Sequence, residues 1–509
     1  MQFAERLRRG FLWSQDPAVN TEKVSMKDLR TKTIRAGLLS ITGRGAAFVI
    51  RLASIIVLGR LLDPTEYGLV GMVTAFTGIL GMFGGFGLFQ AAIQRDLLTD
   101  EQASTLFWLN ILLGSLLTLT CVLMAPVVSG FYHEPRLQAI TSVMGIGFLI
   151  TAAGTQHAAQ LQREMRFGIS VVIDLVALSI STIIAIAMAL ADFGYWAVVS
   201  SSISVPLATT TALWLTSGWI PGLPKWRRGI GSMLNFGGMM TLTGLVAAAN
   251  SSIDKLLLGR FWGAEALGLY GRAYHLIWFP CDNLNVTVGE VAFAALSRTK
   301  DDPARCKRYF LQGYSLVVAL TLPLTAICAL FAEDMIAVAL GPKWGAAADL
   351  FRILAPTILV FAISNPLGWL VNALGLVKRS LMMSLVSTPL LIAGVAIGLP
   401  YGPKGVAAAY SAIMLAKVIP IAWWALHGTG IRTSEILLAL VHPLAASIVA
   451  GGIAYAGHMI YGPSLPLVPR LLADLVLFSG VYLTGLLCVA GQGSLYVDVL
   501  RTVKPATSV

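Results

Sequence analysis

Seven basic residues lie inside long apolar runs of the sequence or at their ends: Arg44, Arg51, Lys255, Arg272, Arg352, Lys417 and Arg470. A charge near the centre of a bilayer costs roughly 2.5–3.5 kcal/mol on insertion scales, so such a residue usually faces a cavity or a partner. Arg44 and Arg51 are seven residues apart. This spacing puts them on one face of a helix, about 10 Å from each other. Two guanidinium groups along one wall suit an anionic substrate, above all a phosphate group.

Several of these residues also have a simpler interpretation. Arg44 could reach the headgroups at the cytoplasmic end of its run, and Arg51 could form an internal ion pair with Asp174. Arg272 could reach the opposite interface, whereas Lys417 lies deep in its apolar run. We assign Arg44, Arg51, Arg272 and Lys417 to a cavity that binds a substrate.

The apolar run 267–296 carries a polar wall. In regular helix geometry its polar side chains fall within an arc of about 100°; they are Arg272, His275, Asp282, Asn283 and Glu290. Pro280 lies between them and frees a backbone carbonyl one turn earlier. We therefore expect a kinked helix that lines a cavity or acts as a gate. The carboxylates of Asp174, Asp282 and Glu290 are candidates for binding a coupling cation or proton.

The repeat counterpart of this run, residues 67–94, lacks these charges and is rich in glycine. The two runs thus share points where a helix is weakened. We predict hinge positions at Gly84, Gly85 and Pro280.

No pattern typical of an enzyme occurs in the sequence. It has no GxSxG elbow, no Walker loop and no HExxH motif. The five cysteines show no CxxC or other metal spacing. We therefore expect neither enzymatic activity nor a cofactor or metal centre.

The elements that position these residues belong to a repeat. Residues 58–71 read LGRLLDPTEYGLVG, and residues 258–271 read LGRFWGAEALGLYG. Six of the fourteen positions are identical, and the second copy begins 200 residues after the first. In both copies an apolar run ends at Gly-Arg and a new one begins at Gly-Leu. This pattern predicts a tight hairpin between two membrane-spanning helices in each of two homologous halves, a common plan among secondary transporters.

The composition is that of a polytopic membrane protein. Of 509 residues, 56% are hydrophobic and only 12% are charged, against about a quarter charged in soluble domains. The apolar runs are continuous, which predicts helices and not a barrel. We count about fourteen spans, arranged as two parallel six-helix repeats that form two lobes, followed by two C-terminal helices.

The distribution of basic residues predicts the topology. With the N-terminus in the cytoplasm, the inside segments hold 24 Lys and Arg and the outside loops hold five. This bias places both termini in the cytoplasm. The net charge of +11 is spread over many short loops, which argues against a nucleic-acid partner. The predicted segments are a basic tail, a lobe, a linker, a second lobe, two added helices and a final tail, at 1–36, 37–216, 217–230, 231–430, 431–495 and 496–509.

Over about residues 37–430 the sequence resembles a known family. The stretches that carry the likeness are IIVLGRLLDPTEYGLVGMVTAF, AAIQRDLLTDEQASTLFWLN, FYHEPRL, LGLYGRAYHLIWFP and VAFAALSR. They resemble the Wzx-type polysaccharide biosynthesis and export flippases, in particular the branch of the colanic acid exporters. The resemblance implies the fold of the multidrug/oligosaccharidyl-lipid/polysaccharide exporter superfamily, with two lobes around a central cavity.

The same resemblance implies a function. A member of this branch would move undecaprenyl-pyrophosphate-linked repeat units across the bacterial inner membrane for exopolysaccharide or lipopolysaccharide synthesis. Its partners would be this lipid-linked oligosaccharide, membrane lipids, and the polymerase and chain-length proteins of the pathway.

Three alternatives remain open at this stage. An exporter of small cationic compounds on the same fold would need a cavity with net negative charge, against the excess of Arg and Lys here. A glycan polymerase or ligase would need a large outside loop, and the longest one expected has about sixteen residues. A scaffold of a glycan assembly complex that transports nothing would need no charged cavity.

Overall fold

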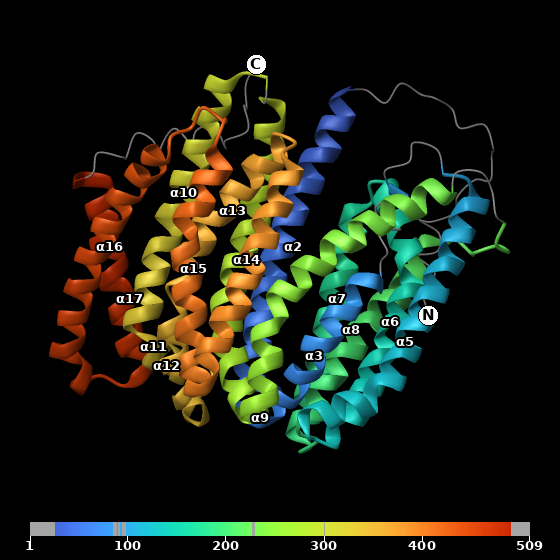
Figure 1. Cartoon of the computed structure of the whole chain (residues 1–509), viewed down its shortest axis with the longest axis horizontal. Helices are drawn as coiled ribbons and strands as arrows, with labels where there is room; N and C mark the ends of the chain where they lie inside the picture. Colours follow the sequence, from blue (N-terminus) through green and yellow to red (C-terminus); the bar gives the residue numbers. More distant parts are fainter. Residues whose placement is uncertain are drawn as a thin grey trace.

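The computed structural model describes residues 26–84, 89, 92–93, 98–225, 230–299 and 301–489; for 26–41, 230–251, 287, 290–291, 377 and 488–489 it describes the backbone alone. The regular elements of this part of the chain are helices (Figure 1). Long apolar runs favour this outcome, because a helix satisfies its backbone hydrogen bonds within one segment.

The first half of the chain contains α2 (Met26–Leu61), α3 (Pro64–Gly84), α5 (Asp100–Tyr132), α6 (Arg136–Arg163), α7 (Phe167–Leu190) and α8 (Tyr195–Ser217). Several of these boundaries follow from local chemistry. Thr99 and Gln102 form a capping box that starts α5. The helix ends at His133, which adopts the left-handed conformation with φ 56°.

The second half contains α9 (Ile230–Arg298), α10 (Pro303–Leu330), α11 (Ala332–Ala339), η1 (Pro342–Trp344), α12 (Gly345–Leu354), α13 (Thr357–Ala373), α14 (Val377–Gly398), η2 (Leu399–Tyr401) and α15 (Gly402–Leu426). The chain then continues through α16 (Thr433–Tyr461), η3 (Gly462–Ser464), α17 (Leu467–Thr484) and η4 (Gly485–Val489). The long α9 is two helices joined at Gly263, whose φ of 79° breaks the helical geometry.

Nine helices among the described residues are long and apolar enough to cross a membrane. The number becomes ten if the pair Pro342–Leu354 and Thr357–Ala373, bent by 47°, is one span. The structure therefore confirms an all-helical multi-pass protein but does not directly confirm fourteen spans. One of the nine, Lys378–Leu426, contains both α14 and α15.

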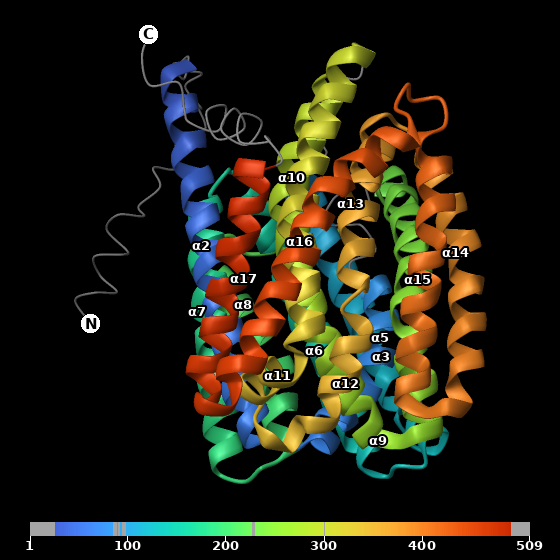
Figure 2. The same ribbon diagram turned by 90° about the vertical axis from the view of Figure 1, so that its left-hand side faces the viewer.

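The helices form two groups that meet along α9. Helices α5 and α8 both pack on α6 and α2 packs on α7, whereas α10 packs on α13 and α16. Helix α9 packs on α3 of the first group and on α12 and α13 of the second. Figures 1 and 2 show that the bend of α9 lies at one end of the molecule and the start of α2 at the other.

We call the end with the bend of α9 and the α2–α3 turn the interlocked end, and the other the opposite end. A large buried cluster lies at the interlocked end and draws residues from both groups. Its members include Leu62, Leu69, Met72, Tyr270 and Trp344, each at most 2% exposed. The two halves of the chain therefore share one core at this end.

Candidate functional site

The two copies of the repeated stretch contact each other at the interlocked end. A Cβ atom added to Gly68 would lie 1.7 Å from the carbonyl oxygen of Ala264. A Cβ atom added to Gly268 would lie 1.8 Å from the carbonyl oxygen of Pro64. Glycine permits this close approach of two backbones. Since Gly68 and Gly268 are repeat equivalents, as are Pro64 and Ala264, each half makes on the other the contact that it receives.

The glycine of each Gly-Arg pair extends this reciprocity. A Cβ on Gly59 would lie 2.6 Å from the side chain of Leu340, and a Cβ on Gly259 would lie 3.0 Å from the ring of Tyr132. In each case a corner of one half covers the glycine of the other half. The buried indole N–H of Trp344 also donates a hydrogen bond of 2.7 Å to the carbonyl oxygen of Gly59, at the C-terminal end of α2.

The two arginines that follow these glycines also reach across. Arg60 Nη2 donates to the carbonyl oxygen of Val338 at 2.7 Å. The Arg260 guanidinium lies 5.6 Å from the centroid of the Phe131 ring, within the range of a cation–π contact. Three of the six identical positions of the repeat, namely the Gly-Arg pair and the glycine at 68 and 268, therefore contact the other half.

Arg272 belongs to this interlocked end. Its guanidinium lies 3.4 Å from the centroid of the Tyr67 ring, and Tyr67 is only 6% exposed. A cation held over an aromatic face is stabilised by the ring quadrupole, more strongly where water is excluded. Arg272 thus joins α9 to α3. Its role in lining a substrate cavity stays a prediction from the sequence.

Arg51 lies on α2 nine residues before Arg60, which is about 13 Å further from the interlocked end. Its side chain is exposed, and it interacts electrostatically with Asp174 on α7 and with His275 and Asp282 on α9. Arg51 therefore lies within electrostatic range of three other polar residues singled out from the sequence, on α7 and α9. A cation that interacts with two carboxylates can bind an anionic substrate, either beside the carboxylates or in place of one of them.

An aromatic stack lies beside this charged group. Phe48 of α2 stacks on Phe279 of α9 with ring centroids 4.9 Å apart and planes 7° apart. The His275 ring also stacks on Phe279, with ring centroids 5.9 Å apart. The stack joins the two helices that carry Arg51 and Asp282, so it fixes their relative position.

The remaining predicted site residues lie elsewhere on α2 and on α15, or are only partly described. Arg44 is half-buried on α2 and takes part in an interaction, and Lys417 is half-buried on α15. The backbone of Glu290 lies in α9, but its side chain is outside the described residues.

The three predicted hinge positions have different outcomes. Gly84 is the last residue of α3, and Gly85 lies outside the described residues. Pro280 lies within α9, whose helical geometry breaks at Gly263 instead. The clearest bend of α9 is thus at the interlocked end, and hinge motion at Gly84, Gly85 or Pro280 stays a prediction.

One buried carboxylate was not among the predicted sites. Asp254 is 2% exposed, and its Oδ2 accepts a hydrogen bond of 2.8 Å from the Tyr270 hydroxyl. Its Oδ1 has no partner among the described residues. The hydroxyls of Tyr274 and Tyr410 lie 3.3 Å apart nearby. A signal was available in the repeat, because position 54 of the first copy is serine.

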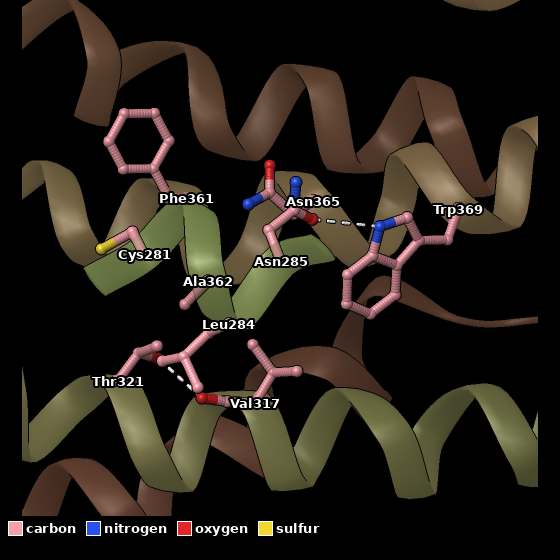
Figure 3. A pocket seen from close by; sticks show the side chains of 9 residues that line it. All are labelled: Cys281, Leu284, Asn285, Val317, Thr321, Phe361, Ala362, Asn365 and Trp369. Carbon is pink, nitrogen blue, oxygen red and sulfur yellow. Dashed lines mark hydrogen bonds between the residues drawn. The ribbon is translucent and has the colours of Figure 1, made fainter. Parts of the chain in front are cut away.

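A small pocket lies within the second helix group, between α9, α10 and α13 (Figure 3). Its volume is about 20 Å³, close to the space that one water molecule needs. The indole N–H of Trp369 donates to Asn285 Oδ1 at 3.1 Å at its edge. This pocket can hold water but not a glycan, so the charged group around Arg51 is the better candidate site.

Comparison with known proteins identifies the family. Residues 57–349 match the family model of a polysaccharide biosynthesis protein. This range is more than half of the chain and contains both copies of the repeated stretch. The chain belongs to the polysaccharide biosynthesis protein family.

Individual relatives agree with this assignment. This family member is 28% identical to the teichuronic acid biosynthesis protein TuaB of Bacillus subtilis, over 74% of this chain and 75% of that protein. It is 24% identical to the lipopolysaccharide biosynthesis protein WzxC of Escherichia coli, over 73% and 76% of the two chains. It is 22% identical to the succinoglycan biosynthesis transport protein ExoT of Rhizobium meliloti, over 67% of each chain.

Solved structures show the same fold at low identity. The lipid II flippase MurJ in an inward closed conformation matches with a TM-score of 0.70 and 14% identity, over 92% of this chain and 100% of that one. A MATE multidrug transporter in an inward-facing conformation matches with a TM-score of 0.60 and 15% identity, over 77% and 95%. This family member is therefore a multi-pass transport protein of polysaccharide biosynthesis with the MurJ/MATE fold, and its family consists of transporters and not enzymes.

Proposed function

We propose that this protein flips an undecaprenyl-pyrophosphate-linked oligosaccharide repeat unit across the bacterial inner membrane by alternating access. The observation that supports the proposal is the electrostatic interaction of Arg51 on α2 with Asp174 on α7 and with Asp282 on α9, the helix along which the two helix groups meet. These groups are joined at one end by reciprocal glycine contacts. Opening and resealing such an end would expose the charged group to one side of the membrane and then to the other.

The proposed topology has fourteen spans. The ten candidate spans become fourteen when α14 and α15 are counted separately, when α2 is added, and when the two arms of α9 are added. An even number puts both termini on one side, and the bias of Lys and Arg makes that side the cytoplasm. The interlocked end would then be the outer end.

The proposed domains keep the boundaries expected from the sequence: a basic tail at 1–36, lobes at 37–216 and 231–430 around a linker at 217–230, added helices at 431–495 and a final tail at 496–509. The end of α8 at Ser217 and the start of α9 at Ile230 support the linker. Polymerase and chain-length proteins of the glycan pathway would act on the flipped product.

In this proposal the pyrophosphate binds to Arg51 between the lobes, and the lipid tail stays in the bilayer. Arg51 is the cation that interacts with carboxylates of α7 and α9, so binding of an anion would weaken its attraction to both. Each carboxylate could then accept a proton or a cation. Asp174, Asp282 and Glu290 remain the proposed coupling residues, and Asp254 joins them because one of its buried oxygens has no partner among the described residues.

The test is flipping of a fluorescent lipid-pyrophosphate-oligosaccharide in proteoliposomes. Arg51→Ala should lower the rate about tenfold or more, because a charge-assisted hydrogen bond contributes about 1.5–3 kcal/mol. Arg51→Lys should retain part of the activity. Lys404→Gln is the matched control. Lys404 Nζ lies 2.6 Å from Asp349 Oδ2 in an exposed ion pair that is not part of this site, and exposed ion pairs contribute little to stability.

Each outcome decides something. Equal flipping by wild type and Arg51→Ala would leave the function standing but remove this site. A folded wild-type protein that does not flip the lipid would refute the function, and transport of small cations would then be tested. Retained gradient dependence after amide substitution of all four carboxylates would refute the coupling proposal.

A further inference from the structure

The connection between α13 and α14 forms a basic pocket that the proposed function does not use. The pocket has a volume of about 450 Å³. Its lining residues are Gly375, Leu376, Lys378, Arg379, Met382 and Trp424. None of them is acidic, so the lining carries two positive charges over an apolar floor. We call it the α14 pocket.

The α14 pocket lies at the opposite end of the molecule, away from the reciprocal glycines. The other end of α14 runs into η2, where the Leu399 carbonyl accepts a hydrogen bond of 2.8 Å from the Trp262 indole. Trp262 adjoins Gly263, where α9 bends at the interlocked end. A helix of 22 residues is about 33 Å long, so the start of α14 lies at the other face of the membrane.

The two basic side chains of the pocket have different roles. Arg379 Nη1 donates to the carbonyl oxygens of His427 at 2.7 Å and Ala425 at 3.2 Å, at the C-terminal end of α15. This arginine therefore fixes the wall of the pocket. Lys378 is exposed and forms no ion pair with any described residue, so its ammonium group is available to a ligand.

The corresponding connection of the first half is built differently. Gly375 and Met165 both take the left-handed conformation, with φ of 74° and 53°, and the same hydrogen bonds close both turns. Three residues after Met165 the chain has Gly168, where Lys378 stands three residues after Gly375. The basic residues of this first turn are engaged, because Arg166 pairs with Glu164 at 3.2 Å and Arg163 donates to a backbone carbonyl at 2.7 Å.

An apolar strip continues from the α14 pocket along the same helix. Leu381, Met382, Leu385 and Val386 are 40–54% exposed, at the spacing of one helical face. A ligand that fits both features has an anionic head for Lys378 and a hydrocarbon chain for the strip. Trp424 supplies the amphipathic ring that is common at the headgroup level.

We infer that the α14 pocket binds the phosphate headgroup of an anionic glycerophospholipid, with one acyl chain lying along α14. Basic pockets between membrane helices are suited to such headgroups. The lipid would bridge α14 and α15 and so brace the second helix group. This inference requires only a membrane location and is independent of flipping.

The test measures stabilisation of the purified full-length protein in detergent by added lipid, as the shift in unfolding temperature. Phosphatidylglycerol should raise the unfolding temperature more than phosphatidylcholine with the same chains. Glycerol phosphate, the head without chains, should have little effect. Lys378→Gln should weaken phosphatidylglycerol binding about fivefold, the contribution of one basic residue near an anionic surface, and Lys378→Arg should restore it.

Arg166→Gln, in the equivalent turn of the first half, is the matched control and should leave the lipid effect unchanged. Equal stabilisation by the two lipids, or an unchanged effect in Lys378→Gln, would overturn the inference. Equal stabilisation by glycerol phosphate alone would assign the pocket to a free anion and overturn the lipid. Native mass spectrometry of wild type and Lys378→Gln with both lipids gives a second readout that does not depend on stability.

Discussion

A single methyl group at the interlocked end should shift the protein toward an opened state. In Gly68→Ala the new Cβ would start 1.7 Å from the Ala264 carbonyl oxygen, whereas real Cβ contacts essentially never fall below 3.0 Å. The backbones must therefore separate by at least 1.3 Å, the difference between these distances. Gly268→Ala requires a similar separation from Pro64. Neither oxygen belongs to a side chain, so no rotamer change can relieve the contact.

The size of the effect follows from the cost of overpacking. Inserting a methylene into a packed interface costs about 1–3 kcal/mol, or roughly a fivefold to hundredfold change in population. The cost applies only while the two copies of the repeat are in contact. A state in which α3 and α9 have separated avoids it and gains population.

The assay is the distance between spin labels at Phe193 and Tyr401, which are 56% and 78% exposed and lie at corners of the two helix groups at the interlocked end. Electron paramagnetic resonance should show a longer distance population in Gly68→Ala and Gly268→Ala than in wild type. Gly271→Ala is the matched control in the same repeated stretch, because its Cβ meets nothing within 4 Å. Identical distance distributions in all three variants would refute the reasoning.

Three further predictions concern single contacts. Trp344→Phe should lower the free energy of unfolding by about 1–3 kcal/mol, since it leaves the Gly59 carbonyl without its indole donor; an unchanged unfolding temperature would contradict this. His157→Leu should leave the stability of the protein unchanged or raise it. The His157 ring is fully buried and neither nitrogen has a partner among the described residues, so an apolar replacement removes the cost of burying two unsatisfied polar atoms. A marked loss of stability would contradict this. The hydrogen bonds from Arg136 lower the pKa of Glu134. The Glu134 carboxylate therefore stabilises the protein fully above its ordinary pKa of about 4.3, and this stabilisation is lost as pH falls through the lowered pKa. The difference in unfolding temperature between wild type and Glu134→Gln should be full at pH 7 and shrink below about pH 4, and a difference independent of pH would refute the assignment.

The family and the helical fold could be predicted from the sequence because both depend on local sequence patterns. Apolar runs and the repeated Gly-Arg and Gly-Leu pairs need no knowledge of distant contacts. The number of spans is harder to establish than the fold. Helices α14 and α15 form one continuous apolar stretch, and α9 stays helical before and after its bend at Gly263. Hydropathy shows how long and how apolar a stretch is. Whether that stretch turns back within the membrane depends on its backbone geometry.

The site was predicted in part. An ion pair of Arg51 with Asp174 stays a prediction, because the structure gives an electrostatic interaction between them and no salt bridge, and it gives a similar interaction of Arg51 with Asp282. Asp254 and Lys255 are neighbours of opposite charge in the sequence. Neighbouring residues on a helix point about 100° apart, so Asp254 turns to Tyr270 while Lys255 lies over the ring of Tyr274 at 4.8 Å. Such a separation cannot be derived from adjacency in the sequence.

The reciprocal glycine contacts also bear on how the chain arose. In an isologous dimer, residue i of one subunit contacts residue j of the other, and j contacts i in return. Gly68 on Ala264 and Gly268 on Pro64 are this pattern within a single chain. A half-length ancestor could have formed this contact with its own copy, and gene fusion would have preserved it. Fusion would also let each half change alone, and positions 54 and 254 now differ, as serine and aspartate.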